Sequence, residues 1–480
     1  MKKYNLLKTI GIIMIVFMLL TWFIPTSFFD GTKFVNDGYD PMGLFDLLLL
    51  PFKFFDWNNS VRLLQIDNIS VEFLSYTGSV LALLSIGVFY KVLNKTGAYG
   101  NLVENVTKKL NKNKIVFIVL SIVLFTLLSS LTGLSLLLFA LVPFFITVLL
   151  KLKFSRVTAL ASTVLPILVG RACSITAWDV TGINNVVYGI KWNDNLILRI
   201  IILIIFLISL IAYVILSKSP ADDVKDDPMY EGIIKKEKSY IPILVLTGVF
   251  FIIIGICMYN WYYVFNSTLV TDAYDTILSN SINGYPFVSN LLGTIEPFGY
   301  WSGFTMSTML IILSMLISFM YSLSFDTYVE AFKSGIKTMI KPVLYVVLAS
   351  IVLVFISNKN SNIFYTISNW FNNHISFETI PFSTFSSGIY GLFVNDYTAV
   401  ALQSVGMLSK FFVDGAYSLA VICFQLVYGI VSVMAPTSIF LVAGLAYLDI
   451  PYKKWLSYIW KLFLGLLLLA ILILLIVSLI

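Results

Sequence analysis

Arg171 and Asp179 are two ionisable residues within one apolar stretch of membrane-spanning length. Charged groups at membrane depth are costly, so they commonly mark a site for an ion or a solute. The guanidinium group of Arg171 could clamp a carboxylate with two hydrogen bonds. Asp179 could hold an ammonium or guanidinium group, or carry a coupling proton. The two side chains could equally pair with each other and lock the local backbone.

Small and polar residues interrupt this stretch and a second one. The first interruption covers residues 170–182 and the second covers residues 428–438. Backbone groups freed at membrane depth must face protein, solute or water, and paired interruptions in two halves of a chain are typical of the binding site of a secondary transporter. A half-helix that begins there offers its N-terminus to an anion. Hydroxyl groups add donors and acceptors, or only recap the helix ends: Ser174, Thr176, Thr181, Ser432, Thr437 and Ser438.

Two pairs of short apolar segments accompany the interruptions. The first pair turns at Leu131-Thr132-Gly133 and the second turns at Asn395-Asp396. Each arm has about 14–17 residues, at or below the roughly 17–25 that span a bilayer. We therefore expect re-entrant hairpins whose tips lie near mid-membrane and face the broken helices. Asn395 and Asp396 are candidate binding residues, or a simple turn.

The composition is that of a polytopic membrane protein. Hydrophobic residues make up 59% of the chain and charged residues 12%, with a mean hydropathy of +0.92. The net charge of +6 does not indicate nucleic acid, because the lysines and arginines gather in short loops beside apolar segments. That pattern predicts the cell membrane, with the N-terminus cytoplasmic and the C-terminus external.

Little in the sequence indicates an enzyme, a metal centre or an ATP-driven pump. The three cysteines lie in apolar stretches, and the single histidine, His374, lies in a polar loop. There is no phosphate-binding loop of the form G-x-x-x-x-G-K-[ST]. We expect no cofactor, although H⁺ or Na⁺ could be a coupling ion. The expected partners are a small solute and the lipid bilayer, with a homodimer left open.

Four regions follow from the order of the segments. We expect an N-terminal repeat (1–217), a solvated cytoplasmic linker (218–239), a linking helix with an external loop (240–299) and a C-terminal repeat (300–480). Each repeat would contain two helices, a hairpin pair, a broken helix and a last helix. The second repeat would run in the opposite direction, with an amphipathic piece at Asp326–Ile340 before its helix Pro342–Ile356. The predicted fold is therefore all-α, with two inverted-topology repeats.

Several motifs resemble the anaerobic C4-dicarboxylate carrier family, in particular its YfcC-like branch within the ion-transporter superfamily. The resemblance extends over most of the chain and implies a secondary transporter with two hairpins and two broken helices. Members are described as dicarboxylate carriers, and relatives exchange arginine for ornithine. The motifs are Thr21-Trp22-Phe23-Ile24-Pro25, Asn94-Lys95-Thr96-Gly97-Ala98, Glu330-Ala331-Phe332 with Gly335, Phe424-Gln425 with Gly429, Pro436-Thr437-Ser438 and Pro451-Tyr452-Lys453-Lys454-Trp455.

The chain departs from the family pattern at the interruptions. The family's Asn-Pro in the first interruption is here Ala177-Trp178, and Asp179 follows it. The sequence therefore predicts a secondary active transporter of a small charged organic solute, working by alternating access. One basic and one acidic residue favour an amino acid, arginine/ornithine-type exchange included, over a dicarboxylate. A membrane-embedded enzyme or a channel is the alternative, but neither a catalytic constellation nor rings of like charge appear.

Overall fold

Helices make up nearly all of the fold. The computed structural model describes residues 6–30, 33–46, 48–49, 63–66, 69–72, 76–217, 227–230, 238–281, 284–357, 363–374, 385–408 and 417–479. Seven helices of these described segments are long and apolar enough to cross a membrane. The predicted all-α polytopic membrane fold is thereby confirmed.

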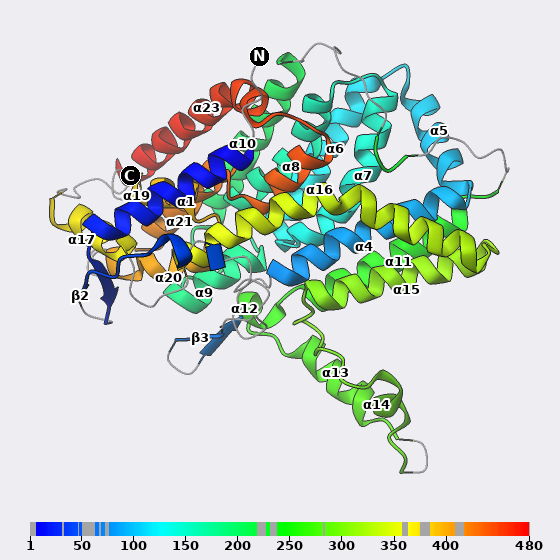
Figure 1. The fold of residues 1–480 in the computed structure, drawn as a ribbon, viewed down its shortest axis with the longest axis horizontal. Helices are drawn as coiled ribbons and strands as arrows, with labels where there is room; N and C mark the ends of the chain where they lie inside the picture. The colour runs from blue at the N-terminus through cyan, green and yellow to red at the C-terminus, as the bar shows by residue number, and fades with distance from the viewer. Residues whose placement is uncertain are drawn as a thin grey trace.

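The first half of the chain contains one helix hairpin and one interrupted helix (Figure 1). Two short antiparallel strand pairs, β1 (Thr26–Phe29) with β2 (Phe34–Gly38) and β3 (Leu63–Ile66) with β4 (Ile69–Glu72), follow the first helix. The helices are α1 (Leu6–Phe23), α4 (Tyr76–Lys95), α5 (Ala98–Leu110), α6 (Lys114–Thr132), α7 (Ser135–Lys151), α8 (Arg156–Ala172), the π-turn η1 (Trp178–Gly182), α9 (Ile183–Tyr188) and α10 (Leu196–Leu216).

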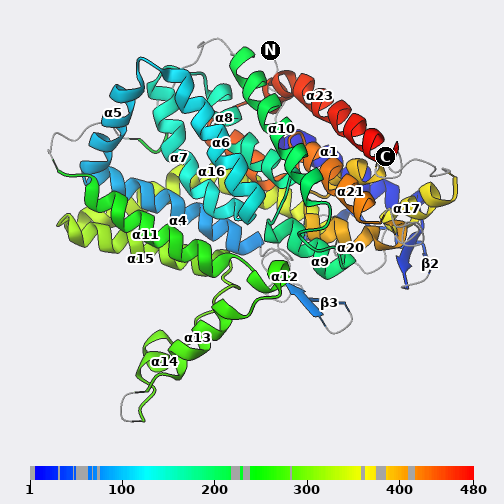
Figure 2. The same cartoon turned by 180° about the vertical axis from the view of Figure 1, so that it is seen from behind.

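The second half repeats this order of hairpin, interrupted helix and last helix. Its helices are α11 (Ile241–Met258), α12 (Trp261–Phe265), α13 (Leu269–Ser279), α14 (Phe287–Leu292), α15 (Gly303–Met320), α16 (Phe325–Ser357), α17 (Ile363–His374), α19 (Phe385–Phe393), α20 (Tyr397–Leu408), α21 (Tyr417–Ser432), α22 (Ile439–Tyr447) and α23 (Tyr452–Leu479). The region predicted as an external loop forms α12–α14, and α13 and α14 project from the helical body (Figures 1 and 2).

Helix α4 packs closely against α15 and α16 because glycines meet at both crossings. A Cβ on Gly303 would lie 2.7 Å from the backbone of Gly78, and one on Gly335 would lie 2.6 Å from the backbone of Gly87. Small residues let helix backbones approach where no hydrophobic force acts between helices in lipid. These two crossings hold α4, α15 and α16 together as one closely packed group.

Helix α16 corrects one sequence prediction. The amphipathic piece 326–340 and the helix 342–356 are one continuous helix with Pro342 inside it. A proline removes one backbone hydrogen bond, but membrane helices tolerate it where neighbouring helices satisfy the freed groups. Packing along α4, with Met339 fully buried, holds the two parts together.

The linker between the halves is not solvated where the structure describes it. Asp227 and Met229 are buried, and the Asp227 carboxylate accepts hydrogen bonds from Thr147 of α7 and Tyr447 of α22. On the opposite side, Lys91 Nζ of α4 donates to the Pro228 carbonyl oxygen at 3.0 Å. The prediction of a solvated linker is therefore wrong for Asp227, Met229 and Tyr230, while Pro228 is exposed, and the rest of 218–237 lies outside the described residues. The sequence did not reveal this docking because its partners lie far away along the chain.

The buried carboxyl of Asp227 predicts a pH-dependent stability. Burial raises its pKa above the ordinary 3.8, although hydrogen bonds from Thr147 and Tyr447 and the charge of Lys91 oppose the shift. A raised carboxyl pKa means that the folded protein binds the proton more tightly, so stability is greatest at low pH and is lost as pH rises through the raised pKa. The melting temperature of the wild type should therefore fall relative to Asp227→Asn between about pH 4 and neutrality.

The exposed Asp275 of α13 supplies the control. Asp275→Asn should keep the wild-type profile of melting temperature against pH. Parallel profiles for the wild type and Asp227→Asn would contradict the buried docking of this segment.

Candidate functional site

The first broken helix ends at Ala172 and restarts at Trp178. Ser155 caps the start of α8 by accepting a hydrogen bond from the Thr158 N–H at 3.2 Å. After the end of α8, the backbone N–H groups of Ile175 and Thr176 donate to the carbonyl oxygen of Ser130, at 3.0 and 3.2 Å. Ser130 lies in the last turn of α6, so the tip of the first hairpin replaces the hydrogen bonds that the break removes.

Three of the predicted site hydroxyls belong to this repair. Thr176 Oγ1 donates to the Leu131 carbonyl oxygen at 2.7 Å, and Ser174 and Thr181 share a hydrogen bond of 2.7 Å between their hydroxyls. None of the three residues lines the cavity described below. Ser174 and Thr181 thus bond to each other within the break, and Thr176 bonds the break to the hairpin tip.

Arg171 and Asp179 form an ion pair across the break. Nε of Arg171 lies 2.8 Å from Oδ2 of Asp179, and the two side chains are 13% and 8% exposed. The N–H of Nε is not aligned for a hydrogen bond, and Oδ1 of Asp179 has no hydrogen-bond donor among the described residues. The pair therefore balances charge, and Oδ1 of Asp179 is buried against the hairpin tip.

Gly133 presses the hairpin tip against Asp179. Its φ of +68° caps α6 in the left-handed conformation that favours glycine, and its N–H donates to the Ser129 carbonyl oxygen. A Cβ at this position would overlap Oδ1 of Asp179. The tip thus contacts the break of its own repeat, as predicted.

The second broken helix satisfies its backbone N–H groups within the break, where Met434 and Ala435 donate to the Val431 carbonyl oxygen. Helix α21 ends at Ser432, whose hydroxyl donates to the Gly429 carbonyl oxygen at 2.6 Å. Thr437 Oγ1 donates to the Leu392 carbonyl oxygen of α19 at 3.3 Å, so the second hairpin contacts the second break. Ser438 precedes α22 and its buried hydroxyl has no hydrogen-bond partner among the described residues. Ser432, Thr437 and Ser438 do not line the cavity.

The two broken helices cross at their breaks. A Cβ on Gly429 would overlap Ala172, the last residue of α8. Gln425 of α21 donates from Nε2 to the Ala172 carbonyl oxygen at 3.1 Å. The second half of the chain therefore supplies a partner for a carbonyl group at the end of the first broken helix.

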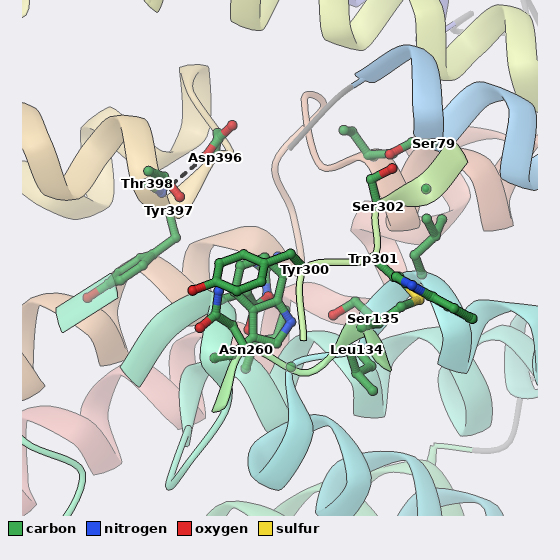
Figure 3. A pocket seen from close by; sticks show the side chains of 18 of the residues that line it. Ser79, Leu134, Ser135, Asn260, Tyr300, Trp301, Ser302, Asp396, Tyr397 and Thr398 are labelled. Carbon is green, nitrogen blue, oxygen red and sulfur yellow. Dashed lines mark hydrogen bonds and ion pairs between the residues drawn. The ribbon is translucent and has the colours of Figure 1, made fainter. Parts of the chain in front are cut away.

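A cavity of about 530 Å³ lies beside this crossing and is bounded by both hairpin tips. It receives four of the predicted residues, Arg171, Asp179, Asn395 and Asp396. Small-ligand sites commonly have about 300–1,000 Å³. The remaining polar lining is not predicted by the sequence and includes Ser135, Asn260, Tyr300 and Ser302 (Figure 3), with Tyr76 and Glu296. The sequence places Glu296 and Asn260 in an external loop.

Helices α7, α15, α20 and α22 all begin at the cavity, and carboxylates occupy the N-termini of α15 and α20. Glu296 accepts hydrogen bonds from the backbone N–H and hydroxyl of Ser302, at 2.6 and 2.7 Å, where α15 starts. Asp396 accepts from the Thr398 N–H at 3.0 Å where α20 starts, and from the Tyr76 hydroxyl at 2.7 Å (Figure 3).

The N-termini of α7 and α22 have no such carboxylate. Their N-cap residues, Leu134 and Ser438, make no side-chain capping bond, and Ser135 and Ile439 at the two helix starts line the cavity. Helix N-termini carry partial positive charge. At the start of α7 the N–H of Ser135 already donates to the Gly133 carbonyl oxygen at 2.9 Å. Arg171 lines the same space, together with the carboxylates of Asp179, Glu296 and Asp396. An anionic group of a solute would therefore fit only at the starts of α7 and α22, beside Arg171.

Comparison with known proteins identifies the family. The family model described as C4-dicarboxylate anaerobic carrier, DcuC, matches residues 5–479. The chain belongs to this family. Membership confirms the resemblance derived from the motifs and makes the chain a multi-pass membrane transporter.

The comparisons with curated proteins and with solved structures add no further identification. No match was found among the curated proteins. Among solved structures, the chain is similar to the YdaH transporter of Alcanivorax borkumensis, with 11% sequence identity, a TM-score of 0.41, and coverage of 98% of this chain and 97% of that one.

Replacing Gly133 with alanine tests the contact between tip and break. Gly133→Ala should cost about 1–2 kcal/mol for the left-handed backbone plus the cost of displacing Asp179. Gly189→Ala is the matched control, since Gly189 has a φ of +70° with nothing within 4 Å of its Cβ position. We expect Gly133→Ala to lower the melting temperature further than Gly189→Ala and to abolish transport, while Gly189→Ala retains it. Equal effects of the two variants would refute the contact.

Proposed function

We propose that the protein is a secondary active transporter that binds a small organic anion through a carboxylate between α7, α22 and Arg171. The observation that carries the proposal is the pair of uncapped helix N-termini beside an arginine. Partial positive charges fixed by the backbone attract a carboxylate without the entropic cost of ordering long side chains. The family description favours a four-carbon dicarboxylate.

An amino acid is the second candidate. Asp179 lines the cavity and keeps Oδ1 without a hydrogen-bond donor among the described residues. An ammonium or guanidinium group of the solute would pair with the Asp179 carboxylate if the hairpin tip moved away from Oδ1, while its own carboxylate binds at the N-termini. Exchange of one cationic amino acid for another is then the expected mode.

Alternating access follows from the same elements. The two hairpins and the two broken helices would move as parts of two inverted repeats around the solute. Asp179 and Asp396 are the candidate carriers of a coupling proton, and Na⁺ is the alternative coupling ion. We further propose the cytoplasmic membrane as the location.

Uptake into proteoliposomes distinguishes the candidates. We expect accumulation of radiolabelled four-carbon dicarboxylates, stimulated by a proton or sodium gradient or by dicarboxylate inside. Uptake of a cationic amino acid stimulated only by internal amino acid would favour the second candidate. Absence of carboxylate uptake under every gradient would refute the proposal.

Variants of the ion pair test its role. If the pair serves the solute, Asp179→Asn should reduce uptake of an amino acid strongly while the melting temperature changes little, because one hydrogen-bonding group replaces another. Arg171→Lys should raise KM if a bidentate carboxylate contact is used. If the pair is structural, each single change should destabilise the protein and the double neutral variant should recover both stability and transport. Full uptake by Asp179→Asn would remove the argument for an amino acid.

Orientation is the remaining element of the proposal. The lysine pattern predicts a cytoplasmic N-terminus and linker and an external C-terminus. A cysteine at position 480 should react with an impermeant reagent from outside intact cells, and one at position 223 should not. Labelling at 223 would refute the inverted-repeat orientation.

A further inference from the structure

Arg199 is a buried charge that pairs with no carboxylate of the described residues. It lies on α10 and is 2% exposed. Its Nη1 donates to the Ser174 carbonyl oxygen at 3.0 Å, and its Nε donates to the Asp194 carbonyl oxygen at 3.2 Å. Its Nη2 is buried and has no hydrogen-bond partner among the described residues. An uncompensated guanidinium at this depth is costly, and its contacts are directed at the first break.

Gln425 donates hydrogen bonds to neighbouring carbonyl groups. Its Nε2 donates to the carbonyl oxygens of Ala172 and Ser174, at 3.1 and 3.4 Å. Its Oε1 accepts from Arg199 Nη1 at 3.2 Å. The two side chains thus hold the carbonyl groups on both sides of Cys173, directly after Arg171.

The network continues to the second hairpin. Asn184 Nδ2 donates to Gln425 Oε1 at 3.0 Å, and the Tyr397 hydroxyl donates to Asn184 Oδ1 at 2.5 Å. Tyr397 lines the cavity and follows Asp396 in the chain. A continuous run of hydrogen bonds therefore links the first break to the tip of the second hairpin.

We propose that Arg199 is a positioning residue, which acts with Gln425 to fix the end of α8 so that Arg171 faces the cavity. The assignment rests on the proposed function, because Arg171 is taken as the group that binds the carboxylate. A guanidinium suits this role because its planar fork reaches two carbonyl oxygens and an amide oxygen at once, whereas the single ammonium of lysine cannot reproduce that geometry. The positive charge of Arg199 also orients the Ser174 carbonyl group toward it, after the end of α8, where no helix fixes the direction of that group.

Arg199→Lys tests the proposal with two measurements. The first is KM and Vmax per folded protein for dicarboxylate uptake. The second is the reactivity of the buried Cys173 with N-ethylmaleimide, in a background with Cys257→Ala and Cys423→Ala. Arg156→Lys is the matched control, since Arg156 also donates to a carbonyl group, that of Leu448 at 2.8 Å, but at the opposite end of α8.

We expect Arg199→Lys to raise KM about tenfold, the loss of one charge-assisted hydrogen bond, with Vmax nearly unchanged. It should also make Cys173 reactive. Arg156→Lys should change neither. Asn184→Ala should shift KM in the same direction, and its effect should not add to that of Arg199→Lys, because both belong to one network.

The outcomes separate the two proposals. Increased Cys173 labelling in a protein whose wild type takes up no carboxylate would keep the positioning role and refute the proposed function. Carboxylate uptake with KM and Cys173 labelling unchanged in Arg199→Lys would refute the positioning role. If Arg199→Lys fails to fold, Asn184→Ala and Gln425→Ala take its place. Additive effects of these two variants on KM would then refute the positioning role.

Discussion

Backbone groups that two broken helices release cannot be left without partners at membrane depth, and the rest of the structure depends on that constraint. The first break has its N–H groups satisfied by the hairpin of its own half, and the second break contacts its hairpin through a side chain while Tyr452 and Trp455 donate to its carbonyl oxygens. The Ser130 carbonyl oxygen receives two N–H groups of the first break, and Thr437 of the second break donates to the Leu392 carbonyl oxygen. The hairpins must therefore lie against the breaks. The crossing of Gly429 over Ala172 then brings both repaired breaks to one place.

The polarity of the cavity follows from this arrangement. Helices that restart or begin in the interior direct their N-termini at the same space, and the carboxylates of Glu296 and Asp396 accept hydrogen bonds at two of them. The N-termini of α7 and α22 carry no such carboxylate, and Arg171 beside them is paired with Asp179. A transporter needs a site that attracts its solute without holding it permanently, and partial charges of helix termini supply a moderate attraction. The chemistry of the site is thus largely set by backbone geometry.

The sequence predicted the parts of the molecule that depend on local pattern. Apolar length predicted the helices, and polar residues within apolar stretches predicted both breaks and the two tips. Four predicted site residues line the cavity: Arg171, Asp179, Asn395 and Asp396. They could be singled out because a charge or a turn within an apolar stretch is unusual wherever it occurs in a sequence.

Long-range contacts escaped prediction. Ser174, Thr176 and Thr181 resemble solute-binding hydroxyls in the sequence. Only the fold shows that their hydroxyl groups form hydrogen bonds within the break and to the hairpin tip. Gln425 and Asp227 gain their roles from partners far away along the chain, and the continuity of α16 through Pro342 depends on packing against α4. Arg199 lies near the start of an apolar helix, where an interfacial position is the simplest interpretation. Its burial depends on how that helix packs.

A cryo-electron microscopy structure in lipid nanodiscs, with a four-carbon dicarboxylate present, would test the central claim most directly. The account predicts density for the solute in the cavity, with one carboxylate within hydrogen-bonding distance of the N–H groups at the starts of α7 and α22 and of the guanidinium of Arg171. Solute density away from both helix starts, or an Arg171 that remains paired only with Asp179 when the solute is bound, would contradict it.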